Sequence, residues 1–417
     1  MLRQQEGSQG VAEAVALCRP EVVCAYPITP QTHIVEHLSD MVRAGDLDPC
    51  EYVMVESEFS AMSVCIGASA TGARAYTATA SQGLLYMAEA LFNASGLGLP
   101  IVMTCANRAV GAPINIWNDH SDAMSQRDSG WIQLYAETNQ EALDLHIQAF
   151  RIAEELSLPV MVCMDGFILT HAFERIDVPA QEQVDSFLPP FQPRQVLDPD
   201  DPVTIGAMVG PEAFFEVKYL AHAKQIDALD LIPEVASEFS ETFGRESGGL
   251  IRTYRADDAE TIVVALGSVL GTIEDVVDEL REQGVKIGVV AIKSFRPFPL
   301  EEVREALGHA ERVVVLEKAL AVGIGGIVSA NVRMALSGIH LHGYTVIAGL
   351  GGRPITKESL HRLFADAIED ELEPLTFLDL DREVVDRELR RMRERHRPGP
   401  HAENVVRDMG IVGARPH

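Results

Sequence analysis

The sequence is poor in basic residues and has no long apolar run. Lysine and arginine together number 34, against 62 aspartates and glutamates, which gives a net charge of −28. A surface of this sign repels nucleic acid and anionic membranes. No apolar stretch approaches the roughly 20 residues that span a bilayer, and the N-terminus lacks the apolar core of a signal peptide. We therefore expect a cytoplasmic protein that has no nucleic-acid or membrane partner.

Cysteine is also scarce, and its spacing excludes the common metal and cluster motifs. The sequence contains no C-x-x-C pair, so it has neither a zinc ribbon nor the ligands of a ferredoxin-type cluster. Most of the cysteines lie in apolar or small-residue segments, which is typical of free thiols in a reducing compartment. The six are Cys18, Cys24, Cys50, Cys65, Cys105 and Cys163. If the protein transfers electrons, the iron must be bound by another chain.

Nucleotide and metal motifs are missing as well. No G-x-x-x-x-G-K-[ST] sequence is present, and the glycine-rich stretch 322–327 lacks the full G-x-G-x-x-G register. His33, His120 and His171 are isolated from one another in the sequence. We therefore predict ordinary polar or packing roles for these histidines and no metal site.

Strand and helix patterns alternate through most of the 417 residues, of which 47% are hydrophobic. The alternation runs to about residue 165 and restarts at Thr261, which indicates parallel sheets covered on both faces. Between them, prolines cluster at 189–202 and a helix is expected around 212–229. We predict an α/β fold with two doubly wound parallel-sheet domains. The predicted parts are a first domain at 1–177, a connector at 178–250, a second domain at 251–371 and a charged tail at 372–417.

A pair of carboxylates, Glu56 and Glu58, follows a predicted strand at 52–55. Ser57 lies between them and can cap the helix that begins there. In a parallel α/β sheet, ligands bind in the crevice outside the carboxyl ends of the strands. The alternative is that both carboxylates only complement the dipole of the helix.

Other predicted strands end at the same edge of the sheet in polar or small residues. These ends carry Thr29, Ser81 with Gln82, and Asn107 with Arg108. The last strand opens into a long polar loop, and a loop of such length in a compact domain is usually functional or mobile. We therefore expect the ligand site at this edge.

Several short motifs occur in a characteristic order. In the first half they are AYPITPQT (25–32), ESE (56–58), TASQGL (79–84), ANRA (106–109), NDHSD (118–122) and QRDSGW (126–131). In the second half they are KSFRPFP (293–299) and GLGGR (349–353). With these motifs the sequence resembles the α subunit of the 2-oxoacid:ferredoxin oxidoreductases, most closely the pyruvate:ferredoxin oxidoreductase (pyruvate synthase) type. The resemblance covers nearly the whole chain.

The resemblance implies a thiamine diphosphate enzyme whose cofactor site is shared between subunits. This chain would supply the pyrimidine-binding domain and then a transketolase-C-like domain, whereas the β subunit would hold the diphosphate and Mg²⁺. The family's magnesium motif, Gly-Asp-Gly followed by an asparagine, does not occur here. Its nearest counterpart, Met164-Asp165-Gly166, has no asparagine after it until Asn331. The implied [4Fe-4S] clusters belong to partner subunits, which include γ and ferredoxin-like δ subunits.

The resemblance also assigns roles to particular residues. Glu58 matches the catalytic carboxyl that acts on N1′ of the aminopyrimidine ring, and Glu56 is expected to be a structural or solvated neighbour. Thr29 and Arg108 match the positions that bind the 2-oxoacid carboxylate. The remaining expected positions are Pro27, Ile28, Ser81 and Gln82 for the cofactor, with Asn107, Asn115 and Asp119 as further candidates in the loop.

The implied reaction is the reversible oxidative decarboxylation of pyruvate with coenzyme A to acetyl-CoA, CO₂ and reduced ferredoxin. Two alternatives stay open. One is the same chemistry on another 2-oxoacid, such as 2-oxoglutarate, a branched-chain oxoacid or oxalate. The other is a non-catalytic scaffold paralogue, although the joint retention of Thr29, Glu58 and Arg108 argues against it.

Overall fold

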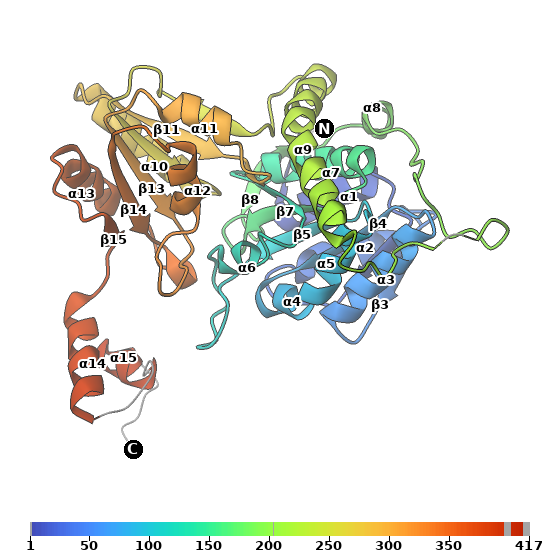
Figure 1. The fold of residues 1–417 in the computed structure, drawn as a ribbon, viewed down its shortest axis with the longest axis horizontal. Coiled ribbons are helices and arrows are strands. Elements are labelled where there is room, and N and C mark those ends of the chain that lie inside the picture. Colours follow the sequence, from blue (N-terminus) through green and yellow to red (C-terminus); the bar gives the residue numbers. More distant parts are fainter. Residues whose placement is uncertain (1, 203, 396–401, 412–417) are drawn as a thin grey trace.

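A computed structural model describes residues 2–202, 204–395 and 402–411, and it contains two large α/β units that lie beside each other (Figure 1). The first unit is built on a sheet of seven strands. Their order is β12 (Ser294–Arg296), β6 (Ile132–Tyr135), β7 (Val160–Asp165), β5 (Val102–Asn107), β4 (Ala75–Thr79), β2 (Val22–Ala25) and β3 (Glu51–Met54). All neighbouring pairs are parallel except β12 and β6.

Helices cover both faces of this first sheet. They are α1 (Gly7–Leu17), α2 (Thr32–Ala44), α3 (Glu58–Ala70), α4 (Ser81–Tyr86), α5 (Ala88–Gly96), α6 (Ser121–Ser125) and α7 (Asn139–Leu156). One apolar core joins α1, α2 and α7 to the sheet, and a second joins α3 and α5 to it. The second core continues into the other unit through residues such as Ile262 and Val290. A small separate ribbon pairs β1 (Leu2–Glu6) with β8 (Phe173–Asp177) in antiparallel fashion.

The second unit has a sheet of six strands. Their order is β15 (Leu375–Phe377), β14 (His342–Ile347), β13 (Arg312–Glu317), β10 (Thr261–Ala265), β11 (Ile287–Ile292) and β9 (Ile251–Tyr254). Only the pair β11 and β9 is antiparallel among the strands of this sheet. Its helices are α10 (Val269–Glu282), α11 (Leu300–Leu307), α12 (Val328–Ala335), η1 (Leu350–Gly352) and α13 (Lys357–Ile368).

The predicted α/β class is confirmed, but the sheets are mixed rather than wholly parallel. The edge strands β12 and β9 run antiparallel to their neighbours. Only Lys293 separates β11 from β12, so the chain passes directly from the second sheet to the edge of the first. The domain boundaries given above stay a proposal, since β12 comes from the second segment and completes the first sheet.

The connector is irregular where its prolines cluster and helical on either side. It contains α8 (Gln181–Phe187) and the long helix α9 (Phe214–Phe243), which continues well beyond the predicted end at residue 229. The prediction was wrong there because the buried face continues past Pro233 through Val235 and Phe239. The Phe187 and Phe239 rings meet edge to face, with centroids 5.6 Å apart.

The predicted tail begins inside the second unit, because β15 (Leu375–Phe377) joins its sheet, and the tail then continues into α14 (Arg382–Arg395) and α15 (Ala402–Asp408), which extend away from that unit (Figure 1). Arg391 and Asp408 join these two helices through a contact of 2.6 Å between Nη1 and Oδ2. The tail residues 396–401 and 412–417 lie outside the described residues. Within the described part of the chain, no helix is both long and apolar enough to cross a membrane.

The two units are joined at the carboxyl ends of their strands by the buried carboxylate of Asp165. His120 Nε2 lies 2.6 Å from Oδ1, while Oδ2 accepts hydrogen bonds from Lys318 Nζ at 3.1 Å and from the backbone and hydroxyl of Ser268. Burial alone raises the pKa of the Asp165 carboxyl, but Lys318, His120 and Ser268 outweigh that effect and hold its pKa well below the usual value. Residues after β7, β10 and β13 therefore share one ionic cluster.

The GLGGR motif (349–353) also contributes contacts between the two units. Gly351 donates its N–H to Asp119 Oδ2 at 2.9 Å, and its carbonyl accepts from Asn115 Nδ2 at 3.1 Å. Gly351 and Gly352 have φ values of +60° and +81°, and a Cβ on Gly352 would lie 2.4 Å from Cβ of Trp117. Only glycine fits so close an approach in this backbone conformation. The loop after β5 is thus fixed against the second unit.

Candidate active site

Thr29 and Arg108 meet at the edge of the first sheet. The loop before α2 is closed by the buried side chain of Gln31, whose Nε2 donates to the carbonyl of Tyr26 at 2.9 Å. Thr29 itself is exposed, and its carbonyl accepts a hydrogen bond of 2.9 Å from Arg108 Nη1. Arg108 Nε donates to the carbonyl of Asn115 at 3.0 Å. The structure therefore brings together the two residues expected to bind a carboxylate.

Arg108 is a buried cation without a carboxylate partner. Its side chain is 6% exposed, and among the described residues no acidic side chain forms an ion pair with it. Burial lowers the pKa of the Arg108 guanidinium, and the charge of Asp122 opposes that shift. A desolvated guanidinium in this state has a strong affinity for an anion that can accept parallel hydrogen bonds.

Asp122, a residue not predicted as part of the site, organises the strand ends around Arg108. Its fully buried carboxylate accepts hydrogen bonds from the backbone N–H groups of Ser81 and Arg108, both at 2.9 Å, and from Asn107 Nδ2 at 2.9 Å. Burial raises the pKa of the Asp122 carboxyl, although these hydrogen bonds oppose the shift. Asp122 thus ties the end of β4 to the end of β5. The NDHSD motif contains this aspartate, but its burial could not be read from the sequence.

Glu58 lies at the first turn of α3, next to the start of α4. Ser57 accepts a hydrogen bond from the N–H of Ser60 at 3.2 Å, so the predicted cap of α3 is confirmed. Glu58 is 8% exposed, and its carboxylate has no hydrogen-bond or ion-pair partner among the described residues. A Cβ on Gly83 would lie 2.7 Å from Glu58 Oε1 and 2.6 Å from Thr79 Oγ1. The carboxylate therefore rests directly over the backbone of a glycine.

Glu56 has a different environment from Glu58. It is exposed and accepts a hydrogen bond of 2.6 Å from the hydroxyl of Ser60, which lowers the pKa of its carboxyl. The structure agrees with the expected structural or solvated role of Glu56. Of the two carboxylates in the ESE motif, only Glu58 is buried and unpaired.

The other predicted positions divide into two groups. Ser81 has φ +50° and its hydroxyl donates to the carbonyl of Ala109 at 2.6 Å, while Gln82 contacts the same hydroxyl. Pro27 is exposed and Ile28 half-buried in the loop that carries Thr29. Asn107 belongs to the Asp122 network, and its Oδ1 is buried without a partner. Asn115 and Asp119 instead hold the loop against Gly351, as described above.

The three histidines form contacts that their spacing in the sequence does not reveal. His120 contacts the buried Asp165 across the junction. His33 and His171 lie side by side, with ring centroids 4.7 Å apart, and His33 Nδ1 is 2.6 Å from Glu6 Oε1. The fold brings these side chains together from distant segments, which the spacing in the sequence does not reveal.

The sequence matches two family descriptions over most of its length. Residues 13–236 match "Pyruvate flavodoxin/ferredoxin oxidoreductase, thiamine diP-bdg", and residues 259–360 match "Pyruvate:ferredoxin oxidoreductase core domain II". The chain belongs to the pyruvate:ferredoxin oxidoreductase family. The predicted resemblance is therefore confirmed, and with it the oxidoreductase class and the thiamine diphosphate-binding character of the first unit.

Two curated relatives and one solved structure give further detail. Pyruvate synthase subunit PorA of Methanosarcina barkeri is 51% identical over 391 residues, which is 91% of this chain and 97% of that protein. Ketoisovalerate oxidoreductase subunit VorA of Pyrococcus abyssi is 41% identical over 381 residues, covering 91% and 95%. A 2-oxoglutarate:ferredoxin oxidoreductase structure from Magnetococcus marinus, with 2-oxoglutarate, coenzyme A and succinyl-CoA bound, has a TM-score of 0.67 at 20% identity. The match covers 89% of this chain and 65% of that one, and it supports the fold.

The position of Glu58 over Gly83 leads to a first prediction. Replacing Gly83 with alanine places a methyl group within contact distance of Glu58, so the carboxylate must move. A misplacement of about 1 Å can cost about 10²-fold in rate, and we expect Gly83→Ala to lower the turnover of the assembled enzyme by roughly that factor.

The matched control is Gly67→Ala in α3, where an added Cβ meets no atom within 4 Å. This variant should keep full turnover and gain up to about 1 kcal/mol in stability from its higher helix propensity. Steady-state kinetics and thermal unfolding of both variants provide the measurement. Equal turnover of the two variants would contradict the view that turnover depends on the close approach of Glu58 to the backbone of Gly83.

Proposed function

We propose that this chain is the α subunit of a pyruvate:ferredoxin oxidoreductase and that it binds the aminopyrimidine part of thiamine diphosphate at Glu58. One observation carries the proposal: the buried carboxylate of Glu58 has no hydrogen-bond or ion-pair partner among the described residues and rests over a glycine whose Cβ would fill its space. The residues fit the cofactor, since N1′ of an aminopyrimidine offers such a carboxyl its missing hydrogen-bond partner. Thiamine diphosphate, when bound, supplies the electron sink that decarboxylation of a 2-oxoacid requires.

The residues of this chain then have separate tasks. Glu58 holds a proton at N1′ and acts as a general acid and base there. Arg108 orients the substrate by donating paired hydrogen bonds to its carboxylate, and the exposed Thr29 adds a hydroxyl donor beside it. The network of Asp122 keeps the end of β5 in place while the substrate binds. Pro27, Ile28, Ser81 and Gln82 line the same edge and remain proposed cofactor contacts.

The diphosphate and Mg²⁺ belong to a β subunit under this proposal. The only counterpart of the magnesium motif is centred on Asp165, and both of its carboxylate oxygens are engaged by His120, Ser268 and Lys318. The ammonium group of Lys318 beside this carboxylate repels a metal cation and disfavours its binding there. The cofactor site is therefore completed by a second chain.

The iron–sulfur clusters are likewise assigned to partner subunits. All six cysteines lie in the described part of the chain as free thiols, five of them buried. No cysteine belongs to a group of three or more potential ligands there. Electrons would pass through clusters of γ and ferredoxin-like δ subunits to ferredoxin, and coenzyme A would accept the acyl group.

Pyruvate is the proposed substrate because identity to the PorA relative, at 51%, exceeds the 41% identity to VorA. The VorA relative makes ketoisovalerate the second candidate. In the assembled enzyme we expect kcat/KM for pyruvate to exceed that for ketoisovalerate by about 10-fold or more, which corresponds to at least about 1.4 kcal/mol. Ferredoxin reduction with each substrate in the presence of coenzyme A is the measurement. A preference for ketoisovalerate would reverse the substrate assignment.

Substitutions at Glu58 and Glu56 form a matched test of which carboxylate is catalytic. Loss of a general acid or base costs about 10²–10⁴-fold, so Glu58→Gln should lose turnover on that scale in the assembled enzyme. Glu56→Gln should stay within a few-fold of the parent, because Glu56 is exposed and bonded only to Ser60. Thermal unfolding serves as the check on folding. Similar activities in the two variants would overturn the assignment and favour the scaffold alternative.

A further inference from the structure

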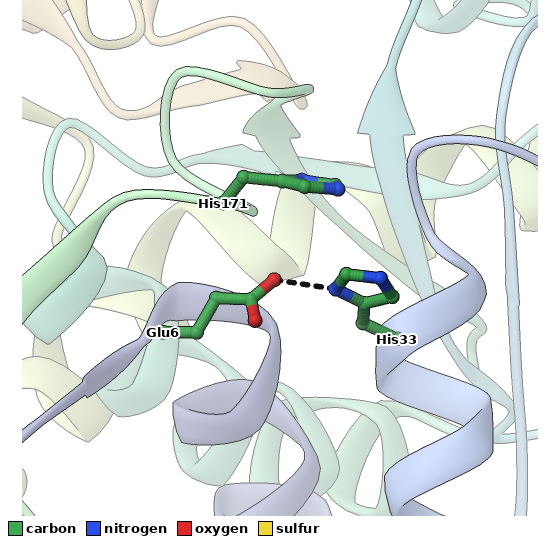
Figure 2. A group of neighbouring side chains, drawn as sticks. All are labelled: Glu6, His33 and His171. Carbon is green, nitrogen blue, oxygen red and sulfur yellow. Dashed lines mark hydrogen bonds and ion pairs between the residues drawn. The ribbon is translucent and has the colours of Figure 1, made fainter.

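Glu6, His33 and His171 form a compact cluster that the proposed reaction does not use. Glu6 ends β1, His33 lies in the first turn of α2, and His171 lies in the loop between β7 and β8. Figure 2 shows the three side chains pointing toward one another from these separate segments. One ligand atom from each side chain lies within 4.8 Å of the others.

We propose that Glu6, His33 and His171 bind a divalent transition-metal ion of the borderline class, such as Zn²⁺. Two imidazole nitrogens and one carboxylate oxygen are a donor set that suits Zn²⁺ and excludes Mg²⁺ and Ca²⁺, which prefer oxygen alone. Three protein ligands leave a fourth position to water. This proposal departs from the expectation from the sequence that no metal site is present.

The spacing of the donor atoms needs little adjustment. Ligand atoms lie about 2.0–2.2 Å from zinc, so three of them converge to within roughly 3.5 Å of one another. Glu6 Oε1 and His33 Nδ1 are already 2.6 Å apart, and the His33 side chain is 47% exposed. Rotation of this exposed imidazole brings a ring nitrogen to the ion, while the carboxylate moves only slightly.

His171 is held by neighbours that do not compete for the metal. Its Nδ1 lies 2.7 Å from Thr170 Oγ1, which also accepts a hydrogen bond of 2.8 Å from the N–H of Phe167. In the tautomer whose Nδ1 donates its hydrogen to Thr170, the lone pair of Nε2 is available to the ion. The Phe167 and His171 ring centroids are 4.8 Å apart. Such contacts around a metal-binding histidine fix its tautomer and its ring orientation.

Glu6 likewise has a free oxygen. It precedes α1, but its side chain does not cap that helix, and among the described residues its only hydrogen-bond or ion-pair partner is His33. A single carboxylate therefore faces two histidines. A bound cation would give all three side chains a common partner.

The position of the cluster indicates what the ion would stabilise. His33 follows Thr29 by four residues, and the loop that carries His171 packs against the same turn, since a Cβ on Gly166 would lie 2.5 Å from Pro30 Cγ. An ion at this point would join β1, the start of α2 and the loop after β7. Under this proposal the ion would hold these three segments together next to the loop that presents Thr29.

Metal titration of the purified full-length chain tests the proposal. After treatment with a chelator, and with a non-chelating reductant present, the chain should bind one equivalent of Zn²⁺ in calorimetry and in equilibrium dialysis with metal analysis. His33→Asn, His171→Asn and Glu6→Gln should each weaken that binding by about 10-fold or more. His37→Asn, one turn further along α2, is the matched control and should bind zinc as the parent chain does.

Cobalt(II) identifies the ligands independently of affinity. In the parent chain it should give ligand-field bands of nitrogen and oxygen ligation without a thiolate charge-transfer band, because the cysteines lie elsewhere. These bands should disappear in His171→Asn. Absence of stoichiometric zinc binding, zinc binding by the His33 and His171 variants as tight as in the parent chain, or a thiolate band would each overturn the proposal. None of these outcomes bears on Glu58 or Arg108, so the proposed function is tested separately.

Discussion

The buried carboxylate of Asp165 is the interaction on which the arrangement of the two units depends. It lies at the carboxyl end of the first sheet and is bonded to Ser268 and Lys318 at the corresponding end of the second. Removing one partner from a buried ion pair typically costs about 3–5 kcal/mol, because the remaining charge stays buried. The two sheets thus face each other through the carboxyl ends of their strands, which is where α/β proteins bind ligands. The long loop after β5 is fixed between them.

This junction explains the structural roles of the two motifs in the second half of the chain, KSFRPFP (293–299) and GLGGR (349–353). Lys293 is buried and contacts Glu141 at 2.5 Å and Glu137 at 2.7 Å, while Ser294–Arg296 completes the first sheet as β12. The glycines of 349–352 allow the loop after β5 to approach. Among the described residues, neither motif forms a hydrogen bond or ion pair with Glu58 or with the guanidinium of Arg108. Both position the unit that carries those residues, and rigid positioning of this kind is what catalytic groups require.

Much of the fold could be predicted from the sequence because its signals are local. Apolar strands such as Val160–Asp165 alternate with amphipathic helices, and Ser57 followed by a helix is a cap that acts within one turn. Placing Thr29, Glu58 and Arg108 at one edge required only the rule that parallel strands share an edge. The crossover strand β12 could not be predicted, since three residues show no periodicity.

The parts that the sequence did not reveal all depend on contacts between distant segments. Asp122 and Asp165 look like ordinary loop or strand-end acids, and only burial makes them centres of hydrogen bonding. Glu6, His33 and His171 have no common spacing, yet a strand end, the start of a helix and a loop bring them together. The length of α9 was underestimated because tertiary packing on Phe239 extends the helix past a proline.

The most direct test of the account is an experimental structure of the assembled enzyme with thiamine diphosphate and pyruvate bound. The account predicts Glu58 within hydrogen-bonding distance, about 2.6–3.2 Å, of N1′ of the aminopyrimidine. It also predicts the pyruvate carboxylate on the Arg108 guanidinium beside Thr29, with diphosphate and Mg²⁺ bound by another chain. A carboxyl from a partner chain at N1′, or a substrate carboxylate remote from Arg108, would contradict it.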